Sequence, residues 1–185
     1  MLFRSRASGL HFIPEERLGR GAVPTLSLAQ NVLLTRTETL GPLGTLRPKA
    51  LAAQALDIMS RYGVKASGPQ ASARSLSGGN LQKFLVGREV SRAPCVLVLN
   101  QPTWGVDAAA SADIRQRLID LARQGSAVLV ISQDLDELFE IADRIAVIHQ
   151  GKVSAPRLTR DVTREDIGLL MAAAPAGADG ALHAH

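Results

Sequence analysis

The sequence is poor in the residues that small proteins use to reinforce a core. Aromatic residues make up only 3% of the 185 residues, and there is a single cysteine. One cysteine excludes an internal disulfide and fits a reducing compartment. Hydrophobic residues nevertheless reach 46% of the chain, which is long enough for one domain. The core must therefore be aliphatic.

Long apolar runs and basic stripes are missing as well. No apolar run reaches the roughly 18 residues that cross a bilayer, and the N-terminus does not resemble a secretory signal. The net charge is +4, and the basic residues are spread along the chain without interleaved aromatics. These absences predict a cytosolic protein that does not bind nucleic acid. Cys95, inside the apolar run CVLVL, is interpreted as a small buried residue.

The front of the chain has mainly helical patterns. A short apolar strand at residues 10–13 is followed by a helical pattern at 27–34. A clearer helix begins at Pro48 and ends before Gly63. Its apolar stripe is expected to consist of Leu51, Ala55, Leu56 and Met59.

The back of the chain alternates strands with helices. Apolar runs at 95–99 and 127–131 are joined by a helix over 108–124, and this βαβ pattern predicts a parallel sheet buried on both faces. We expect an α/β fold with a parallel sheet core and a helical subdomain in front. The remaining predicted elements are a helix at 81–91, a helix at 134–142, a strand at 144–149, a turn at Gln150–Gly151, and a disordered tail from residue 175.

The strongest local motif is LSGGNLQKF at residues 76–84. Gly78 and Gly79 let backbone N–H groups approach a ligand, and they lie where a helix begins. Unpaired N–H groups and the helix dipole favour an anion at such a place. Ser77 adds a hydroxyl group. The motif is therefore a candidate phosphate-binding cap, although SGG is also common in flexible turns.

Polar residues follow both apolar strands of the back half. Asn100 and Gln101 end the first strand and lead to Asp107, while Ser132 and Gln133 end the second. The carboxyl ends of parallel strands are where α/β sheets place ligand chemistry. These segments, together with LSGGN in this order and spacing, predict one site.

Here the sequence resembles the ATP-binding-cassette (ABC) transporter ATPases. LSGGN-x-QK is similar to their signature motif, residues 96–107 to Walker B plus the D-loop, and residues 128–138 to the switch-histidine region. FIPEERLGRG (12–21) and DIGLLMA (166–172) resemble segments of the second ATPase half of the tandem nucleoside and sugar importers. The resemblance covers roughly residues 9 to 172 and implies a partial P-loop NTPase fold.

The phosphate-binding loop G-x-x-x-x-G-K-[ST] of that family does not occur. The only Gly-Lys pair, Gly151–Lys152, lies in a late turn and is followed by Val153. Without the loop, no lysine or hydroxyl reaches the β- and γ-phosphates of a nucleotide bound in this half. The expectation is that the chain is a fragment, or a split or mis-started gene product, that is inactive by itself.

Several positions depart from the family's catalytic pattern. Asn100 stands at the Walker B aspartate position, Gln101 at that of the catalytic glutamate and Gln133 at that of the switch histidine. Glu15 falls at about the Q-loop glutamine, with Glu16 as the alternative. No intact metal site is expected, and Trp104 is interpreted as a residue packed at the domain surface.

The resemblance implies that ATP is sandwiched between two ATPase halves. Signature residues then serve a nucleotide held by a partner half, and ATP and Mg²⁺ are cofactors of the assembled transporter. The implied signature residues are Ser77, Gly78, Gly79, Asn80 and Gln82. The implied partners are the other ATPase half, membrane permease subunits and, indirectly, a substrate-binding protein, on the cytoplasmic side of the inner membrane.

Two alternative functions remain open beside the import of nucleosides or simple sugars. One is a degenerate pseudo-ATPase half that only dimerises or regulates, and the other is a soluble ABC protein of DNA repair or translation. The predicted layout is an ATPase domain at 1–156, divided into 1–25, 26–92 with the signature and 93–156 from Walker B to the switch. A C-terminal helix and tail occupy 157–185.

Overall fold

The computed structural model describes residues 2–35 and 47–172. They fall into two compact units, which divide between Gln133 and Asp134. The predicted tail from residue 175 and most of the Gly/Pro-rich link at 41–48 lie outside the described residues. Within the described residues, no helix is both long and apolar enough to span a bilayer.

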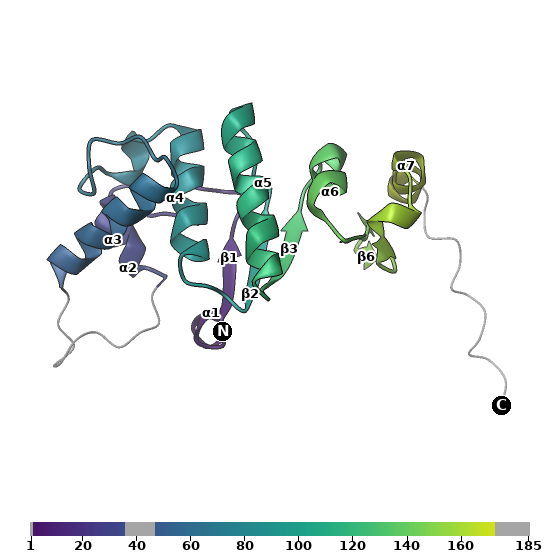
Figure 1. Cartoon of the computed structure of the whole chain (residues 1–185), viewed down its shortest axis with the longest axis horizontal. Coiled ribbons are helices and arrows are strands. Elements are labelled where there is room, and N and C mark those ends of the chain that lie inside the picture. The colour runs from purple at the N-terminus through teal and green to yellow at the C-terminus, as the bar shows by residue number, and fades with distance from the viewer. Residues whose placement is uncertain (1, 36–46, 173–185) are drawn as a thin grey trace. The chain divides into compact units, whose positions relative to one another are not determined.

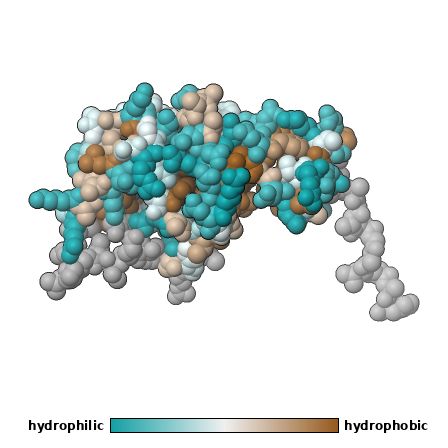
Figure 2. Space-filling model, viewed as in Figure 1, coloured by the Kyte–Doolittle hydropathy of each residue, from teal (hydrophilic) through white to brown (hydrophobic). Residues whose placement is uncertain are grey.

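The first unit is built on a three-stranded parallel sheet, in the order β1-β2-β3. Its strands are β1 (Leu10–Ile13), β2 (Val96–Asn100) and β3 (Ala127–Ile131), which confirms the predicted parallel core. Helix α5 (Ala108–Arg123) is the crossover between β2 and β3 and lies in front of the sheet in Figure 1. Hydrophilic residues dominate the visible surface of this helix (Figure 2).

The sheet is covered on one face only. Leu97 and Leu99 of β2 are fully buried, whereas Leu129 and Ile131 of β3 are 55% and 38% exposed. The prediction of strands buried on both faces is therefore wrong for β3. The described helices α4 and α5 pack against β1 and β3 respectively, and within the described residues the alternate side chains of β3 have no second layer over them.

Three further helices form the helical part of this unit, at the left of Figure 1. They are α2 (Leu28–Leu33), α3 (Pro48–Arg61) and α4 (Gly78–Val90). Ser27 begins α2 with a reciprocal capping box, and Pro48 occupies the first turn of α3 as predicted. The short α1 (Leu2–Ala7) precedes β1, and a 3-10 turn, Ala73–Ser75, precedes the signature segment.

The buried stripe of α3 differs from the predicted one. Leu51, Ala55 and Ile58 are buried, while Leu56 is 50% exposed. The spacing of four and three residues between the buried positions follows one helix face. Leu56 is adjacent to Ala55 in sequence and points about 100° away from it around the helix.

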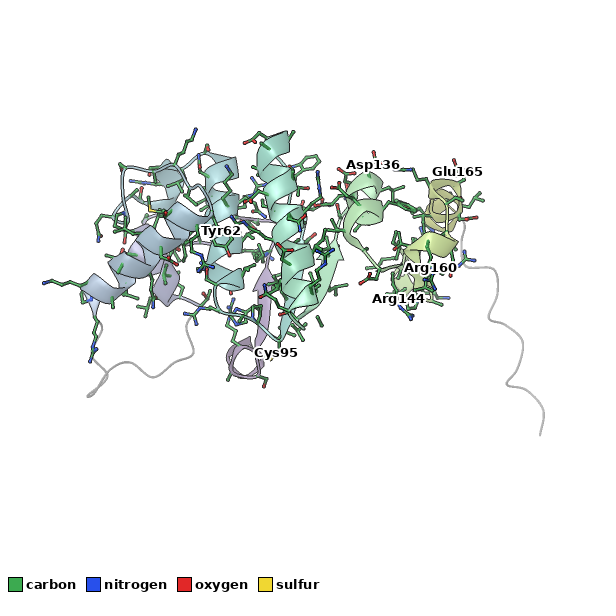
Figure 3. All side chains as sticks on the ribbon, viewed as in Figure 1. Tyr62, Cys95, Asp136, Arg144, Arg160 and Glu165 are labelled. Carbon is green, nitrogen blue, oxygen red and sulfur yellow. The ribbon has the colours of Figure 1, made fainter. Side chains whose placement is uncertain are left out.

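Tyr62, just after α3, joins the helical part to the rest of the unit (Figure 3). A Cβ on Gly87 would lie 2.7 Å from the Tyr62 ring, so α4 can approach this closely only with glycine there. The Arg117 guanidinium lies 4.2 Å from the centre of the same ring and donates to the backbone oxygen of Arg61. Helices α3, α4 and α5 therefore meet at one side chain.

Glu89 is a fully buried acid at the end of α4 and has three basic neighbours. It accepts from His11 Nδ1 at 2.7 Å, Arg6 at 3.0 Å and Arg88 at 2.8 Å. Burial alone would raise the pKa of Glu89, but the His11 hydrogen bond and the two guanidinium charges outweigh it and lower this pKa to about 2.

Arg88 connects the same cluster to the loop between β1 and α2. Its guanidinium donates to the backbone oxygens of Asn31 and Gly21, at 3.3 and 2.9 Å. The Asn31 side chain in turn accepts from Val23 N–H and donates to backbone oxygens at the start of α2. The loop after β1 and the helix α2 are thus both fastened to α4.

Cys95 is exposed, which contradicts its predicted burial (Figure 3). It precedes β2 at the amino end of the sheet, where a Cβ on Gly9 would come within 2.8 Å of its sulfur. The side chain therefore lies at the sheet rim and not within the apolar strand that follows it.

The second unit has its own small core of Ile145, Val147, Val162 and Ile167. Its helices are α6 (Leu135–Ile141) and α7 (Arg164–Ala172), which an ion pair between Asp136 and Arg164 joins at 2.6 Å. Figure 3 labels Asp136 on α6 and Glu165 on α7. A 3-10 turn, Thr159–Asp161, precedes α7.

The predicted strand at 144–149 is divided in two. Arg144–Ile145 (β4) pairs with Arg157–Leu158 (β7), whereas Ile148–His149 (β5) pairs with Lys152–Val153 (β6). The two halves separate because each pairs with a different strand. The predicted turn between β5 and β6 is confirmed, with Gln150 and Gly151 at φ +47° and +76°.

We predict that Glu89→Gln destabilises the first unit by about 3–5 kcal/mol, because it leaves buried guanidinium groups without their acid. The low pKa of Glu89 means that its contribution is present above the unfolded value of about 4.3 and is lost as the pH falls toward 2. Urea unfolding at pH 6 and pH 3 measures both effects. Glu165→Gln, at an exposed site, is the control, and equal stability losses in both variants contradict the prediction.

A second prediction concerns the uncovered face of the sheet. Leu129→Thr should reduce aggregation without loss of stability, because this side chain is already exposed to water. Leu97→Thr, a change of the same type at a buried position, should cost about 2–5 kcal/mol. Light scattering and thermal unfolding compare the two variants. If Leu129→Thr leaves aggregation unchanged, the uncovered face of the sheet does not drive aggregation.

Candidate functional site

Helix α4 begins inside the signature segment, which we define as residues 76–80. Ser77 is its N-cap and Gly78 its first residue, three residues earlier than predicted. The Ser77 Oγ accepts from the Asn80 backbone N–H at 3.4 Å and from its side-chain amide at 2.9 Å. Both glycines consequently lie in the first turn, where backbone N–H groups have no partner within the helix.

Two amide side chains of the signature helix hold neighbouring segments. The Asn80 Oδ1 accepts from the backbone N–H of Lys65 at 2.7 Å, and the buried Gln82 donates from Nε2 to the Pro102 oxygen at 2.8 Å. The Gln82 Oε1 has no hydrogen-bond partner among the described residues. Gln82 therefore joins the signature helix to the chain that follows β2.

The segment after β2, residues 100–107, packs directly against the signature segment. A Cβ on Gly79 would lie 3.6 Å from Val106, so the two backbones come close. Asp107 then begins α5 as its N-cap and accepts from the Ala110 N–H at 2.9 Å. This backbone hydrogen bond lowers the pKa of Asp107, which is exposed and therefore remains ionised.

Asn100 and Gln101 occupy different surroundings although they are adjacent. Asn100 ends β2 and lines a cavity of about 810 Å³ that Glu15 also lines, so the structure brings these two predicted residues together. Gln101 is buried and has a left-handed backbone at φ +53°. Its N–H donates to the oxygen of Ile131 at 2.8 Å, which links the ends of β2 and β3.

The remaining predicted residues lie more openly. Gln133 is exposed just after β3, and no hydrogen bond within the described residues joins it to Asn100 or Gln101. Trp104 lies at the surface of the unit, as interpreted, and is 68% exposed, so only a small part of its side chain packs against neighbouring residues. Gly105, the next residue, has a left-handed backbone with φ +64°.

Sequence reasoning missed one residue at this site, Arg17. A Cβ on Gly78 would lie 2.9 Å from its Nη1, and one on Gly105 would lie 3.7 Å from the same atom. The guanidinium thus stands beside both the signature segment and the segment after β2. Burial lowers the pKa of Arg17. The sequence signal for Arg17 is its place in the segment 12–21, which is identified from the sequence only by its resemblance to the family.

The residues at this edge of the sheet do not fit Mg²⁺ by themselves. Asn100 and Gln101 offer neutral amide oxygens, and the Asp107 carboxylate caps α5. Hard cations of this kind are held by carboxylates and phosphate oxygens. Among the described residues no group of three or more His, Cys, Asp or Glu side chains is placed to hold a metal.

Comparison with known proteins gives consistent relatives. No protein-family model matches the chain. It is 38% identical over 161 residues to the nucleoside import ATP-binding protein NupA of Lactococcus lactis, covering 86% of this chain and 32% of that protein. It is 39% identical over 168 residues to the glucose import ATP-binding protein TsgD13 of Haloferax volcanii, covering 89% and 30%. The chain thus spans about a third of the length of these relatives.

Solved structures show the same fold. The ATP-binding cassette MJ0796, in a dimeric post-hydrolysis state bound to ADP and Pi, matches with a TM-score of 0.69 at 22% identity, over 86% of this chain and 66% of that one. A metal-chelate type ABC transporter in an inward-facing conformation matches with a TM-score of 0.70 at 19% identity, over 88% and 63%. The parallel sheet, the signature helix and the relatives agree: this chain belongs to the ATP-binding-cassette ATPase family, and the relatives that it matches are import ATP-binding proteins.

Proposed function

We propose that this chain is the signature-bearing part of an importer's ATP-binding protein and that it caps ATP held mainly by another ATPase half. The observation that carries the proposal is the start of α4. There Ser77 and Gly78 are exposed, and Gly79 lies against Val106 at the carboxyl side of the sheet.

The chemistry of that helix start suits a phosphate group. The first N–H groups of α4 have no partner within the helix, and the helix dipole favours negative charge beside them. In the proposed role, the G-x-x-x-x-G-K-[ST] loop of another ATPase half supplies the main phosphate contacts of the nucleotide. The signature segment therefore acts in trans, on the exposed side of α4.

The proposed biological role is uptake of nucleosides or simple sugars. The relatives named above support it, because their names describe nucleoside and glucose import. In this role the chain works with a second ATPase half and with permease subunits, peripherally on the cytoplasmic face of the membrane, and indirectly with a substrate-binding protein. Hydrolysis of ATP drives the uptake in this role, and Mg²⁺ is bound with the nucleotide that the partner half holds.

A second candidate function is that of a half whose own site is silent. Asn100, Gln101 and Gln133 place only amides where a catalytic acid or base is needed. An amide can orient water but cannot take its proton, and general base catalysis contributes about 10²- to 10⁴-fold. This half then completes its partner's site and transmits motion without hydrolysing ATP itself.

The capping role predicts an ATP-dependent cross-link. In the full-length transporter, Cys95→Ser first removes the exposed native thiol, and Ser77→Cys is then paired with a cysteine in the partner half's phosphate loop. We expect the cross-link when ATP is trapped and its loss without nucleotide. Ser60→Cys, exposed on α3, is the control position. If the Ser77→Cys cross-link does not form in the ATP-trapped transporter, the proposed capping role is wrong.

Restoring the missing groups tests the silent site. The combined changes Asn100→Asp, Gln101→Glu and Gln133→His in the full-length protein should raise ATP turnover, because the site regains a base. Steady-state hydrolysis by the reconstituted transporter measures the change. Gln116→Glu, an exposed amide-to-acid change on α5, should leave turnover as it was. Unchanged turnover in the restored protein shows that these amides do not limit the site.

A further inference from the structure

Arg17 lies beside two glycines that come from different segments. A Cβ on Gly78 would approach Nη1 to 2.9 Å, and one on Gly105 would lie 3.7 Å from Nη1 and 3.8 Å from Nη2. The guanidinium therefore lies closely over Gly78 and at ordinary contact distance from the Gly105 position. Gly78 and Gly105 are themselves exposed, so this space opens toward the solvent side of the signature segment.

The backbone around Arg17 is fixed to the same helix that carries the signature segment. The Arg17 oxygen accepts from Ala22 N–H at 2.7 Å, which closes a short loop. Gly21 in that loop packs on Leu85 of α4, where a Cβ would lie 2.8 Å from the leucine Cδ1. Arg88 of α4 also donates to the Gly21 oxygen. The backbone position of Arg17 relative to α4 is therefore fixed by the fold.

The guanidinium of Arg17 has no hydrogen-bond or ion-pair partner among the described residues. Arg20, three residues on, forms an ion pair with Glu16 at 2.9 Å although it is far more exposed. Burial also lowers the pKa of Arg17, and no acidic neighbour opposes that effect. Removing part of a cation from water without an acceptor costs free energy. An anion at this place would recover it.

We propose that Arg17 is a phosphate-binding residue of the composite ATP site and contacts the terminal phosphate of the nucleotide that Ser77 and the two following glycines cap. This inference rests on the proposed capping function. It adds a full positive charge to a helix start that otherwise offers only N–H groups and a hydroxyl.

The chemistry favours the terminal phosphate over the rest of the nucleotide. A guanidinium is planar and presents paired N–H groups that match phosphate oxygens. Its side chain lies against Gly78, so the guanidinium is placed to meet a phosphate that comes against the exposed face of the signature segment. ATP has a γ-phosphate to place there and ADP has none, so Arg17 should discriminate between them.

The test uses the full-length ATP-binding protein assembled with its permease, because the site is shared between two halves. Arg17→Gln removes the charge, Arg17→Lys keeps the charge without the paired N–H groups, and Ser77→Ala reports on the cap itself. Arg20→Gln is the matched control in the same loop. The measurements are the affinities for ATP and ADP, the KM and kcat of hydrolysis, and the thermal unfolding midpoint.

We expect Arg17→Gln to weaken ATP affinity about 10- to 100-fold, as loss of a charged hydrogen bond does, with no change for ADP or in the unfolding midpoint. Arg17→Lys should recover part of the loss, and Arg20→Gln should lose nothing. Equal losses for ATP and ADP, or a lower unfolding midpoint, indicate a structural role and overturn the proposal. If Ser77→Ala weakens ATP binding and Arg17→Gln does not, only the role of Arg17 fails. If both variants bind ATP normally, the capping function fails with it.

Discussion

The interaction on which the first unit depends is the buried pair of Arg88 and Glu89. The Arg88 guanidinium donates to the loop between β1 and α2, and the carboxylate of the next residue, Glu89, accepts from His11 of β1 and Arg6 of α1. Neither charge could be buried alone without a large loss of stability. Their mutual bond, together with His11 and Arg6, makes the burial tolerable and fixes the far end of the signature helix.

Fixing one end of a rigid helix places its other end. Nine residues toward the amino end of α4 from Arg88, Gly79 meets the segment after β2, and the buried Gln82 joins the two by a hydrogen bond to Pro102. Tyr62, which follows α3, contacts Gly87 of α4 and Arg117 of α5, so it holds these three helices together. The helix start thus presents its N–H groups from a braced position, which is what a cap for a phosphate requires.

The order of elements could be predicted from the sequence because it depends on local apolar periodicity and on Pro and Gly punctuation. The strands of the sheet, the start of α3 at Pro48 and the turn at Gln150–Gly151 all follow such signals. Exposure could not be predicted in this way. Leu129 reads as a core residue in any apolar run, and only the three-dimensional packing shows that its face is uncovered. Arg17 could not be found from the sequence because the two glycines beside it, Gly78 and Gly105, are 61 and 88 residues away along the chain.

The left-handed backbone at Gln101 restricts how this position can evolve. A φ of +53° is tolerated by Asn, Asp, Gly and a few flexible polar residues, but it is strained for Val, Ile or Thr. Even if selection on catalysis were relaxed at the end of β2, the drift of this residue would remain confined to a small polar set. Glutamine and glutamate both belong to that set of flexible polar residues, and a single substitution separates them.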